Sequence, residues 1–170
     1  MKNVMIVEDQ KMIRSILERY IEKDNELLLV ASIEGAEEAC EICGMKKIHL
    51  ILMDVQTAHR ENGLAAVKKI KEKYPNIKIV VVTSLVDGEI LEQAKCFGAD
   101  SLWYKDTDEG TLMQVVQRTM AGEHVEIYLP RGAYREFPVS GGWKIGSSHG
   151  GLENTLYRGR KIFLNNLLLG

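Results

Sequence analysis

The chain has 170 residues, with 22 lysines and arginines against 24 aspartates and glutamates and a hydrophobic fraction of 45%. This balance is typical of one soluble globular domain with an additional segment, and it excludes a disordered chain, a collagen-like chain and a disulfide scaffold. The apolar runs at residues 27–31 and 48–53 are far shorter than the roughly 20 residues that cross a bilayer, and the N-terminus lacks the features of a signal peptide. We therefore expect a cytoplasmic protein with no membrane contact.

Short apolar runs alternate with longer amphipathic segments through the first 122 residues. Gly44, Gly98 and Gly122 are expected to end three helices, and Pro75 is expected to stop another. Five strand–helix units whose strands are apolar on both faces predict an α/β fold, a doubly wound parallel sheet covered by helices on both sides. The expected strands are residues 3–7, 27–32, 50–53, 77–82 and 101–104, and the expected helices are residues 10–23, 34–43, 63–74, 89–97 and 108–121.

Composition changes near residue 130. Residues 131–170 contain six basic and two acidic side chains and eight of the 15 glycines, whereas residues 1–130 contain 16 basic and 22 acidic side chains. We therefore expect a folded domain at residues 1–122 and a linker with an atypical, irregular tail at residues 123–170.

The cysteines include a Cys-x-x-Cys pair, Cys40 and Cys43, besides Cys96. The pair lies in a helical pattern, and no second pair completes a zinc site. A structural role for these thiols is therefore favoured over a redox or metal-binding role.

Polar side chains follow four of the five expected strands. Glu8 and Asp9 come after the first strand, Asp54 after the third, Thr83 after the fourth and Lys105 after the fifth. Sites in such sheets lie outside the carboxyl ends of the strands. Three neighbouring carboxylates repel one another unless a cation lies among them, and oxygen ligands suit Mg²⁺. With a lysine and a hydroxyl, this set can receive a phosphoryl group, and Asp54 on the middle strand is the expected acceptor.

In these features the chain resembles the receiver domain of response regulators, a CheY-like domain, over about residues 1–122. The resemblance implies the flavodoxin-like strand order 2-1-3-4-5. The pair Lys105-Asp106 and residues 120–123 are similar to the NarL/FixJ branch of transcriptional regulators. The matching segments are Val7-Glu8-Asp9, Leu52-Met53-Asp54-Val55, Val82-Thr83-Ser84, Gly98-Ala99-Asp100 and Lys105-Asp106.

The resemblance implies a phosphoacceptor that catalyses its own phosphotransfer and dephosphorylation. Asp54 would take phosphate from a sensor histidine kinase, and Mg²⁺ would be held by Asp9, Asp54 and the main-chain carbonyl of Gln56, with help from Glu8. Lys105 would pair with the phosphoryl oxygens.

Within the same resemblance, Thr83 would turn inward on phosphorylation, and that movement would be the switch. Two departures affect this site. The family usually has an aromatic residue three positions before the lysine, whereas this chain has Leu102, and only Tyr104 of its neighbours shares the same strand face. The loop at residues 55–62 is about one residue longer than the family's common form.

Two other enzyme or binding classes fit less well. A flavin or nucleotide module would need a glycine- or hydroxyl-rich loop after the first strand, where Glu8-Asp9-Gln10 would repel a phosphate. A phosphohydrolase with an aspartyl nucleophile usually has a second acid two residues later, where this chain has Gln56. The serious alternative is a stand-alone receiver that acts through protein contacts without binding DNA.

The tail differs from the output module of NarL/FixJ regulators. Residues 131–170 are too few for a helix-turn-helix with a linker, and no stretch shows its pattern. Residues 141–151 resemble a loop, and residues 161–169 are expected to form a strand or hairpin or to pack on a second chain in a homodimer. DNA binding, which is usual for the family, is therefore not expected of this 170-residue form.

Overall fold

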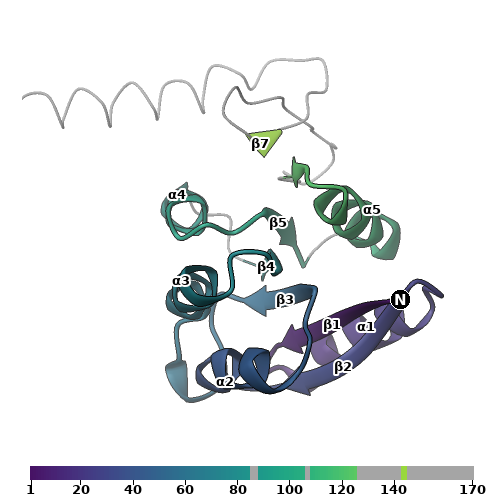
Figure 1. The fold of residues 1–170 in the computed structure, drawn as a ribbon, viewed down its shortest axis with the longest axis horizontal. Coiled ribbons are helices and arrows are strands. Elements are labelled where there is room, and N and C mark those ends of the chain that lie inside the picture. The colour runs from purple at the N-terminus through teal and green to yellow at the C-terminus, as the bar shows by residue number, and fades with distance from the viewer. Residues whose placement is uncertain (85–87, 106–107, 126–142, 145–170) are drawn as a thin grey trace, which may run out of the picture.

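The structure is a computed structural model and describes residues 1–84, 88–105, 108–125 and 143–144 (Figure 1). Five strands alternate with five helices, as the sequence predicts. In chain order the elements are β1 (Lys2–Val7), α1 (Lys11–Glu22), β2 (Leu27–Ile33), α2 (Glu37–Met45), β3 (Leu50–Asp54), the 3₁₀ turn η1 (Ala58–Arg60), α3 (Gly63–Lys73), β4 (Lys78–Thr83), α4 (Gly88–Cys96), β5 (Ser101–Tyr104), α5 (Glu109–Met120), β6 (His124–Val125) and β7 (Trp143–Lys144).

The five main strands form one parallel sheet in the order β2-β1-β3-β4-β5, which confirms the predicted flavodoxin-like topology. Helices α1 and α5 lie on one side of this sheet, and α2, α3 and α4 lie on the other (Figure 1). The order reverses between β1 and β3, so the carboxyl ends of these two strands open onto the crevice in which doubly wound folds bind their ligands.

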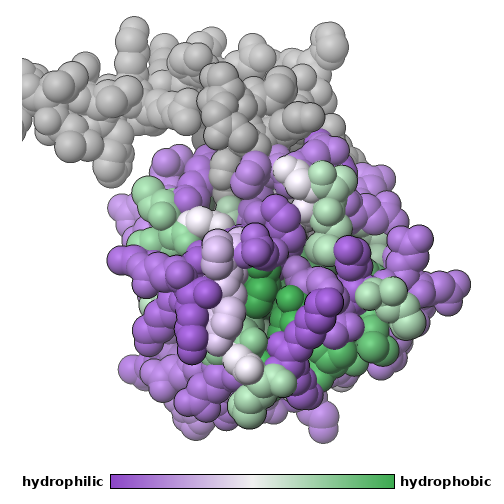
Figure 2. Space-filling model, viewed as in Figure 1, coloured by the Kyte–Doolittle hydropathy of each residue, from purple (hydrophilic) through white to green (hydrophobic). Residues whose placement is uncertain are grey.

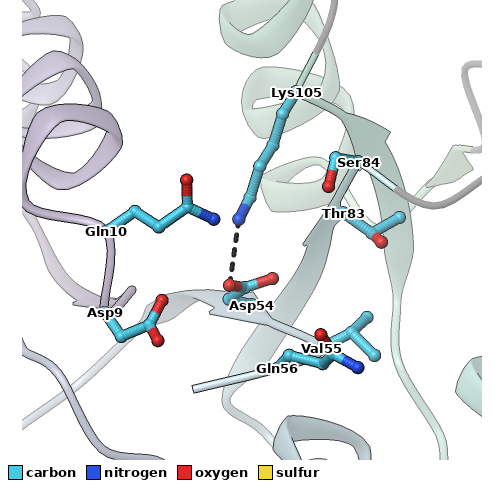
Figure 3. Close-up of a pocket in the computed structure, with 8 residues that line it drawn as sticks. All are labelled: Asp9, Gln10, Asp54, Val55, Gln56, Thr83, Ser84 and Lys105. Carbon is cyan, nitrogen blue, oxygen red and sulfur yellow. Dashed lines mark ion pairs between the residues drawn. The ribbon is translucent and has the colours of Figure 1, made fainter. Parts of the chain in front are cut away.

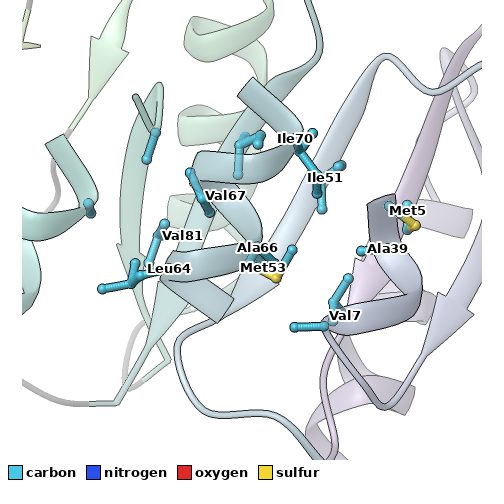
Figure 4. Packing of buried hydrophobic residues seen from close by; sticks show 14 of the residues in the cluster. Met5, Val7, Ala39, Ile51, Met53, Leu64, Ala66, Val67, Ile70 and Val81 are labelled. Atoms are coloured by element: carbon cyan, nitrogen blue, oxygen red, sulfur yellow. The ribbon is translucent and has the colours of Figure 1, made fainter. Parts of the chain in front are cut away.

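Alternation along the strands divides the apolar side chains between two cores. In β1, Val4 and Ile6 pack toward α1 and α5, whereas Met5 and Val7 pack toward α2 and α3. Figure 4 shows the second core, in which Met53 of β3 lies against residues of α3. Fully burying such a side chain stabilises the fold by about 1.5–3 kcal/mol, so both faces of the sheet hold the site's strands in place.

Helix α2 differs from its prediction at both ends. It begins at Glu37 rather than at residue 34, because the Glu34 carbonyl and the Ala36 N–H form hydrogen bonds with the loop after β3. The prediction that Gly44 ends this helix was wrong: the helix continues to Met45. A Cβ at Gly44 would lie 3.0 Å from the Tyr74 hydroxyl, so glycine serves close packing there. Gly98 and Gly122 do follow α4 and α5 with positive φ, as predicted.

The chain after α5 stays attached to the sheet for a few residues. Val125 is buried, and its N–H donates to the Ser101 hydroxyl at 2.9 Å. The short strands β6 and β7 pair in parallel, so two residues of the expected 141–151 loop form a strand. The expected strand or hairpin at residues 161–169 lies outside the described residues.

The face seen in Figure 2 is mainly hydrophilic, with hydrophobic atoms in a central strip. No helix in the described part of the chain has an apolar stretch of bilayer-spanning length; α1 and α5 have 12 residues each.

Candidate functional site

The predicted site residues come together at the carboxyl edge of the sheet. Asp54 ends β3 and Thr83 ends β4, while Glu8 and Asp9 follow β1 and Lys105 follows β5. In Figure 3, Asp54 lies between Asp9 and Gln10 on one side and Thr83 and Ser84 on the other. The pocket between them measures about 150 Å³ and is lined by Asp9, Gln10, Asp54, Val55, Gln56, Thr83, Ser84 and Lys105.

Lys105 joins two of the carboxylates. Its ammonium lies 2.9 Å from Asp54 Oδ2 and 2.6 Å from Glu8 Oε2, and its side chain is only 6% exposed. Glu8 is itself buried, and its Oε1 accepts a hydrogen bond from the Gln10 N–H. The lysine therefore partly neutralises both buried acids and points at the position where a group bound to Asp54 would lie.

The site holds more negative than positive charge. One oxygen from each of Glu8, Asp9 and Asp54 lies within 4.8 Å of the others, against the single ammonium of Lys105. Within the described residues, the Asp9 carboxylate forms neither a hydrogen bond nor an ion pair. Three hard oxygen ligands, one of them available, suit Mg²⁺, which prefers carboxylates and retained waters. The donor set therefore fits this metal.

Burial determines the ionisation of the two inner acids. It raises the pKa of the Asp54 carboxyl, an effect that Lys105 and the backbone N–H groups of Val55 and Gln56 oppose. Burial also raises the pKa of the Glu8 carboxyl; Lys105 opposes this shift, and the negative charge of Asp54 adds to it. Burial thus disfavours the charged forms of both acids, and a bound cation would relieve that cost.

Residues 4–117 match the family model described as the response regulator receiver domain. The chain belongs to this family. The receiver is 28% identical over 122 residues to the response regulator protein VraR of Staphylococcus saprophyticus, covering 72% of this chain and 58% of that protein. The chain thus spans less than two thirds of the length of the curated relatives it matches.

Solved structures share the fold. A two-component response regulator of the LuxR family from Aurantimonas sp. SI85-9A1 superposes with a TM-score of 0.68 at 23% identity, covering 72% of this chain and 86% of that one. A DNA-binding response regulator of the LuxR family from Staphylococcus aureus gives 0.66 at 20% identity, covering 71% and 99%. These likenesses show that the chain has the receiver fold.

A close backbone approach fixes Asp54 in this receiver. A Cβ built at Gly63 would lie 1.8 Å from the Asp54 carbonyl oxygen, and the Gly63 N–H donates to the Val55 carbonyl at 2.9 Å. Only glycine allows α3 to begin directly behind Asp54. The sequence signalled this position only as the start of a helix.

The loop at residues 55–62 has unusual backbone geometry. His59 and Arg60 both have positive φ, 58° and 61°, although neither is glycine. This left-handed conformation lowers stability by roughly 1–2 kcal/mol per residue and persists where surrounding contacts hold it. Those contacts come from residues 34–37, which the sequence did not connect with the site.

The strand faces around the lysine agree with the predicted alternation. Leu102 and Tyr104 pack in the core beneath α2, α3 and α4, whereas Trp103 packs on the opposite side. Tyr104 stands beside Thr83 in the sheet register, and both are buried. An aromatic side chain therefore lies next to Thr83, although the position three before Lys105 is Leu102.

The thiols lie away from this pocket. All three cysteines are free, and burial, followed by the neighbouring Cys40, raises the pKa of the Cys43 thiol to about 11. A thiol with that pKa is protonated at neutral pH and is a poor nucleophile or metal ligand. This agrees with the structural role expected from the sequence.

Proposed function

We propose that this receiver accepts a phosphoryl group on Asp54 from the phosphohistidine of a sensor histidine kinase and thereby controls an output. The resemblance to the family makes transcription the proposed output. The observation that carries the proposal is the charge-unbalanced pocket at the end of the middle strand, in which Lys105 Nζ lies 2.9 Å from Asp54 Oδ2. The cluster offers more oxygen ligands than its single lysine can neutralise, and such an arrangement is typical of functional sites.

In the transfer, an Asp54 oxygen forms a bond to phosphorus while the bond from phosphorus to the kinase imidazole breaks, and the imidazole nitrogen takes a proton from solvent. Phosphoryl transfer needs mainly in-line positioning and charge neutralisation. Lys105 supplies one positive charge from a buried side chain. Mg²⁺ supplies more positive charge when bound by Asp9, Asp54 and the main-chain carbonyl of Gln56, with Glu8 beside them.

Thr83 couples the state of Asp54 to the rest of the fold in this proposal. Its hydroxyl lines the same pocket, at the end of β4 and directly before the segment that leads to α4. A hydrogen bond from Thr83 to a phosphoryl oxygen would exist only in the phosphorylated state, and that difference is what shifts a two-state equilibrium.

The described residues do not show which process the receiver controls. Similarity to regulators such as VraR supports transcription control as the output. Homodimerisation and a cytoplasmic location belong to the same proposal. The alternative, a stand-alone receiver that signals by protein contacts, shares the same phosphoacceptor chemistry. The expectation that this form does not bind DNA concerns residues whose structure is not described, so it stays a prediction.

The test is phosphorylation by acetyl phosphate, followed by intact mass. With Mg²⁺ the protein should gain one phosphoryl group, and with EDTA or in Asp54→Asn it should gain none. Asp24→Asn is the matched control: its side-chain oxygen accepts a hydrogen bond at the far edge of the sheet, a bond that asparagine can keep, so phosphorylation should persist. A phosphoryl group on Asp54→Asn would disprove the assignment.

Two further variants separate the roles in the pocket. Lys105→Ala should reduce phosphorylation, because the transferring group loses its cation. Thr83→Ala should still be phosphorylated but should lose the accompanying change in amide exchange of β4 and α4. Equal loss of phosphorylation in both variants would contradict this division.

A further inference from the structure

Arg14 of α1 contacts the backbone that carries the metal-binding aspartate. Its Nη1 donates to the main-chain carbonyl of Glu8 at 2.7 Å, and its Nη2 donates to Glu34 Oε1 at 2.8 Å. The peptide plane between Glu8 and Asp9 is thus held from outside the pocket. Because the Asp9 carboxylate forms no hydrogen bond or ion pair among the described residues, its direction depends on this backbone.

The second partner of Arg14 begins a turn that supports the opposite side of the pocket. The Glu34 carbonyl accepts from the Ala58 N–H at 3.0 Å, and the Ala36 N–H donates to the Thr57 hydroxyl at 3.1 Å. The Glu37 N–H donates to Glu61 Oε2 at 2.9 Å. Residues 34–37 therefore hold the loop at residues 55–62, which contains Gln56.

A contribution to folding stability does not account for the contacts of Arg14, because its ion pair with Glu34 is weak. The Arg14 side chain is 15% exposed but that of Glu34 is 62% exposed, and pairs with one partner in solvent contribute little to stability. What distinguishes Arg14 is that its fork joins the loop after β1 to the turn that holds the loop after β3.

We propose that Arg14 is a positioning residue for the Mg²⁺ site, acting through residues 34–37 to fix the separation between Asp9 and the Gln56 carbonyl. The inference rests on the proposed function of this pocket. Mg²⁺ requires nearly ideal octahedral geometry with ligands at 2.0–2.1 Å, so a small displacement of either loop weakens binding. Groups that orient metal ligands typically contribute about 10-fold to 100-fold in affinity.

The test is isothermal titration of the full chain with MgCl₂ and no phosphodonor. Arg14→Gln should raise the Kd for Mg²⁺ about 10-fold. Glu34→Gln, which keeps an acceptor but loses the charge, should raise the Kd by a smaller factor. Arg19→Gln is the matched control, because it makes the same change on an exposed side chain of the same helix and should leave the Kd unchanged.

Two readouts separate positioning from folding. Without Mg²⁺, Arg14→Gln should match Arg19→Gln in melting temperature, and at saturating Mg²⁺ its rate of phosphorylation by acetyl phosphate should return to that of the wild type. An unchanged Kd in Arg14→Gln, or a rate that stays low at saturating Mg²⁺, would overturn the proposal. If Arg14→Gln does not fold, an unchanged Kd in Glu34→Gln overturns it.

Arg14→Lys tests the fork itself. Lysine keeps the charge but lacks the rigid planar fork that holds the Glu8 carbonyl and the Glu34 carboxylate in one geometry. The Kd of Arg14→Lys for Mg²⁺ should therefore lie between those of the wild type and Arg14→Gln. A wild-type Kd in Arg14→Lys would show that charge alone is responsible and would overturn the positioning role. Wild-type protein that binds Mg²⁺ but takes no phosphate on Asp54 would instead refute the proposed function alone.

Discussion

The two edges of the sheet each contain a cluster of buried acids and lysines, and the two clusters are built differently. At the amino edge, Asp100 is paired with the ammonium groups of Lys71 and Lys78, and it also accepts from the Ile79 N–H at 2.9 Å. At the carboxyl edge, Lys105 pairs with two of three neighbouring carboxylates, those of Glu8 and Asp54 but not that of Asp9. In the first cluster, both oxygens of the acid have partners, whereas the second cluster has excess negative charge.

The difference between the two clusters supports the proposal that the site lies at the carboxyl edge. A buried carboxylate that is fully paired links elements, here α3, β4 and the start of β5, and leaves nothing for a ligand. Buried carboxylates that outnumber their cations cost stability, and such a cost is typical of sites that bind a ligand or carry a reaction. Acid–lysine pairing alone therefore does not mark a site; an excess of carboxylates over cations does.

The backbone of the two edges differs in the same direction. At the amino edge, the positive φ values belong to Gly98 and Gly122, which adopt them without strain. At the carboxyl edge, they belong to His59 and Arg60. The carboxyl edge therefore holds backbone strain that the amino edge avoids.

The largest expected effect lies at the amino edge. Asp100→Asn should lower the free energy of unfolding by about 2 kcal/mol, because it leaves two lysines without their acid. This loss is smaller than for a fully buried ion pair, because the Lys71 and Lys78 side chains remain 14% and 29% exposed to solvent. Urea denaturation at pH 7 measures the change. Unaltered stability would show that this cluster does not hold the edge together.

Asp54→Asn should raise the free energy of unfolding, in contrast to Asp100→Asn. Burial raises the pKa of the Asp54 carboxyl above its unfolded value, so the folded protein binds this proton more tightly than the unfolded chain does. Wild-type stability then falls as pH rises from the unfolded pKa through the folded one. Without Mg²⁺, the variant should be more stable than the wild type at pH 7, and this gain should vanish below about pH 4. Urea titrations at several pH values test it; a gain that grows toward acid pH would contradict the argument.

The smallest effect concerns the backbone. His59→Gly should raise the free energy of unfolding by about 0.5 kcal/mol, because the relief of left-handed strain exceeds the added freedom of the unfolded chain. Gly98→Ala should lower it by about 1 kcal/mol, since φ is 88° there. Thermal denaturation resolves both changes. Destabilisation by His59→Gly would mean that the loop is not strained.

Much of the fold could be predicted because its signals are local. Buried strands of a parallel sheet are continuous apolar runs, and Gly98, Gly122 and Pro75 interrupt the helical patterns beside them. The site could be anticipated too, because each candidate follows a strand directly and parallel strands bring those positions to one edge. The ends of the helix at residues 37–45 were harder to predict. Hydrogen bonds with a distant loop delay its start, and Gly44 lies within the helix because it packs closely against Tyr74.

Sequence patterns were enough to predict the α/β class and the set of acids, hydroxyl and lysine at the carboxyl edge, and the family resemblance added the sheet order. The pairing of these residues is visible only in the folded protein: Lys105 bridges Glu8 and Asp54, Asp9 stays available, and Arg14 joins the loop after β1 to the turn at residues 34–37. Strand periodicity is a property of neighbouring residues and is therefore visible in the sequence. An ion pair or a fork of hydrogen bonds, in contrast, depends on the separation of atoms that packing alone brings together.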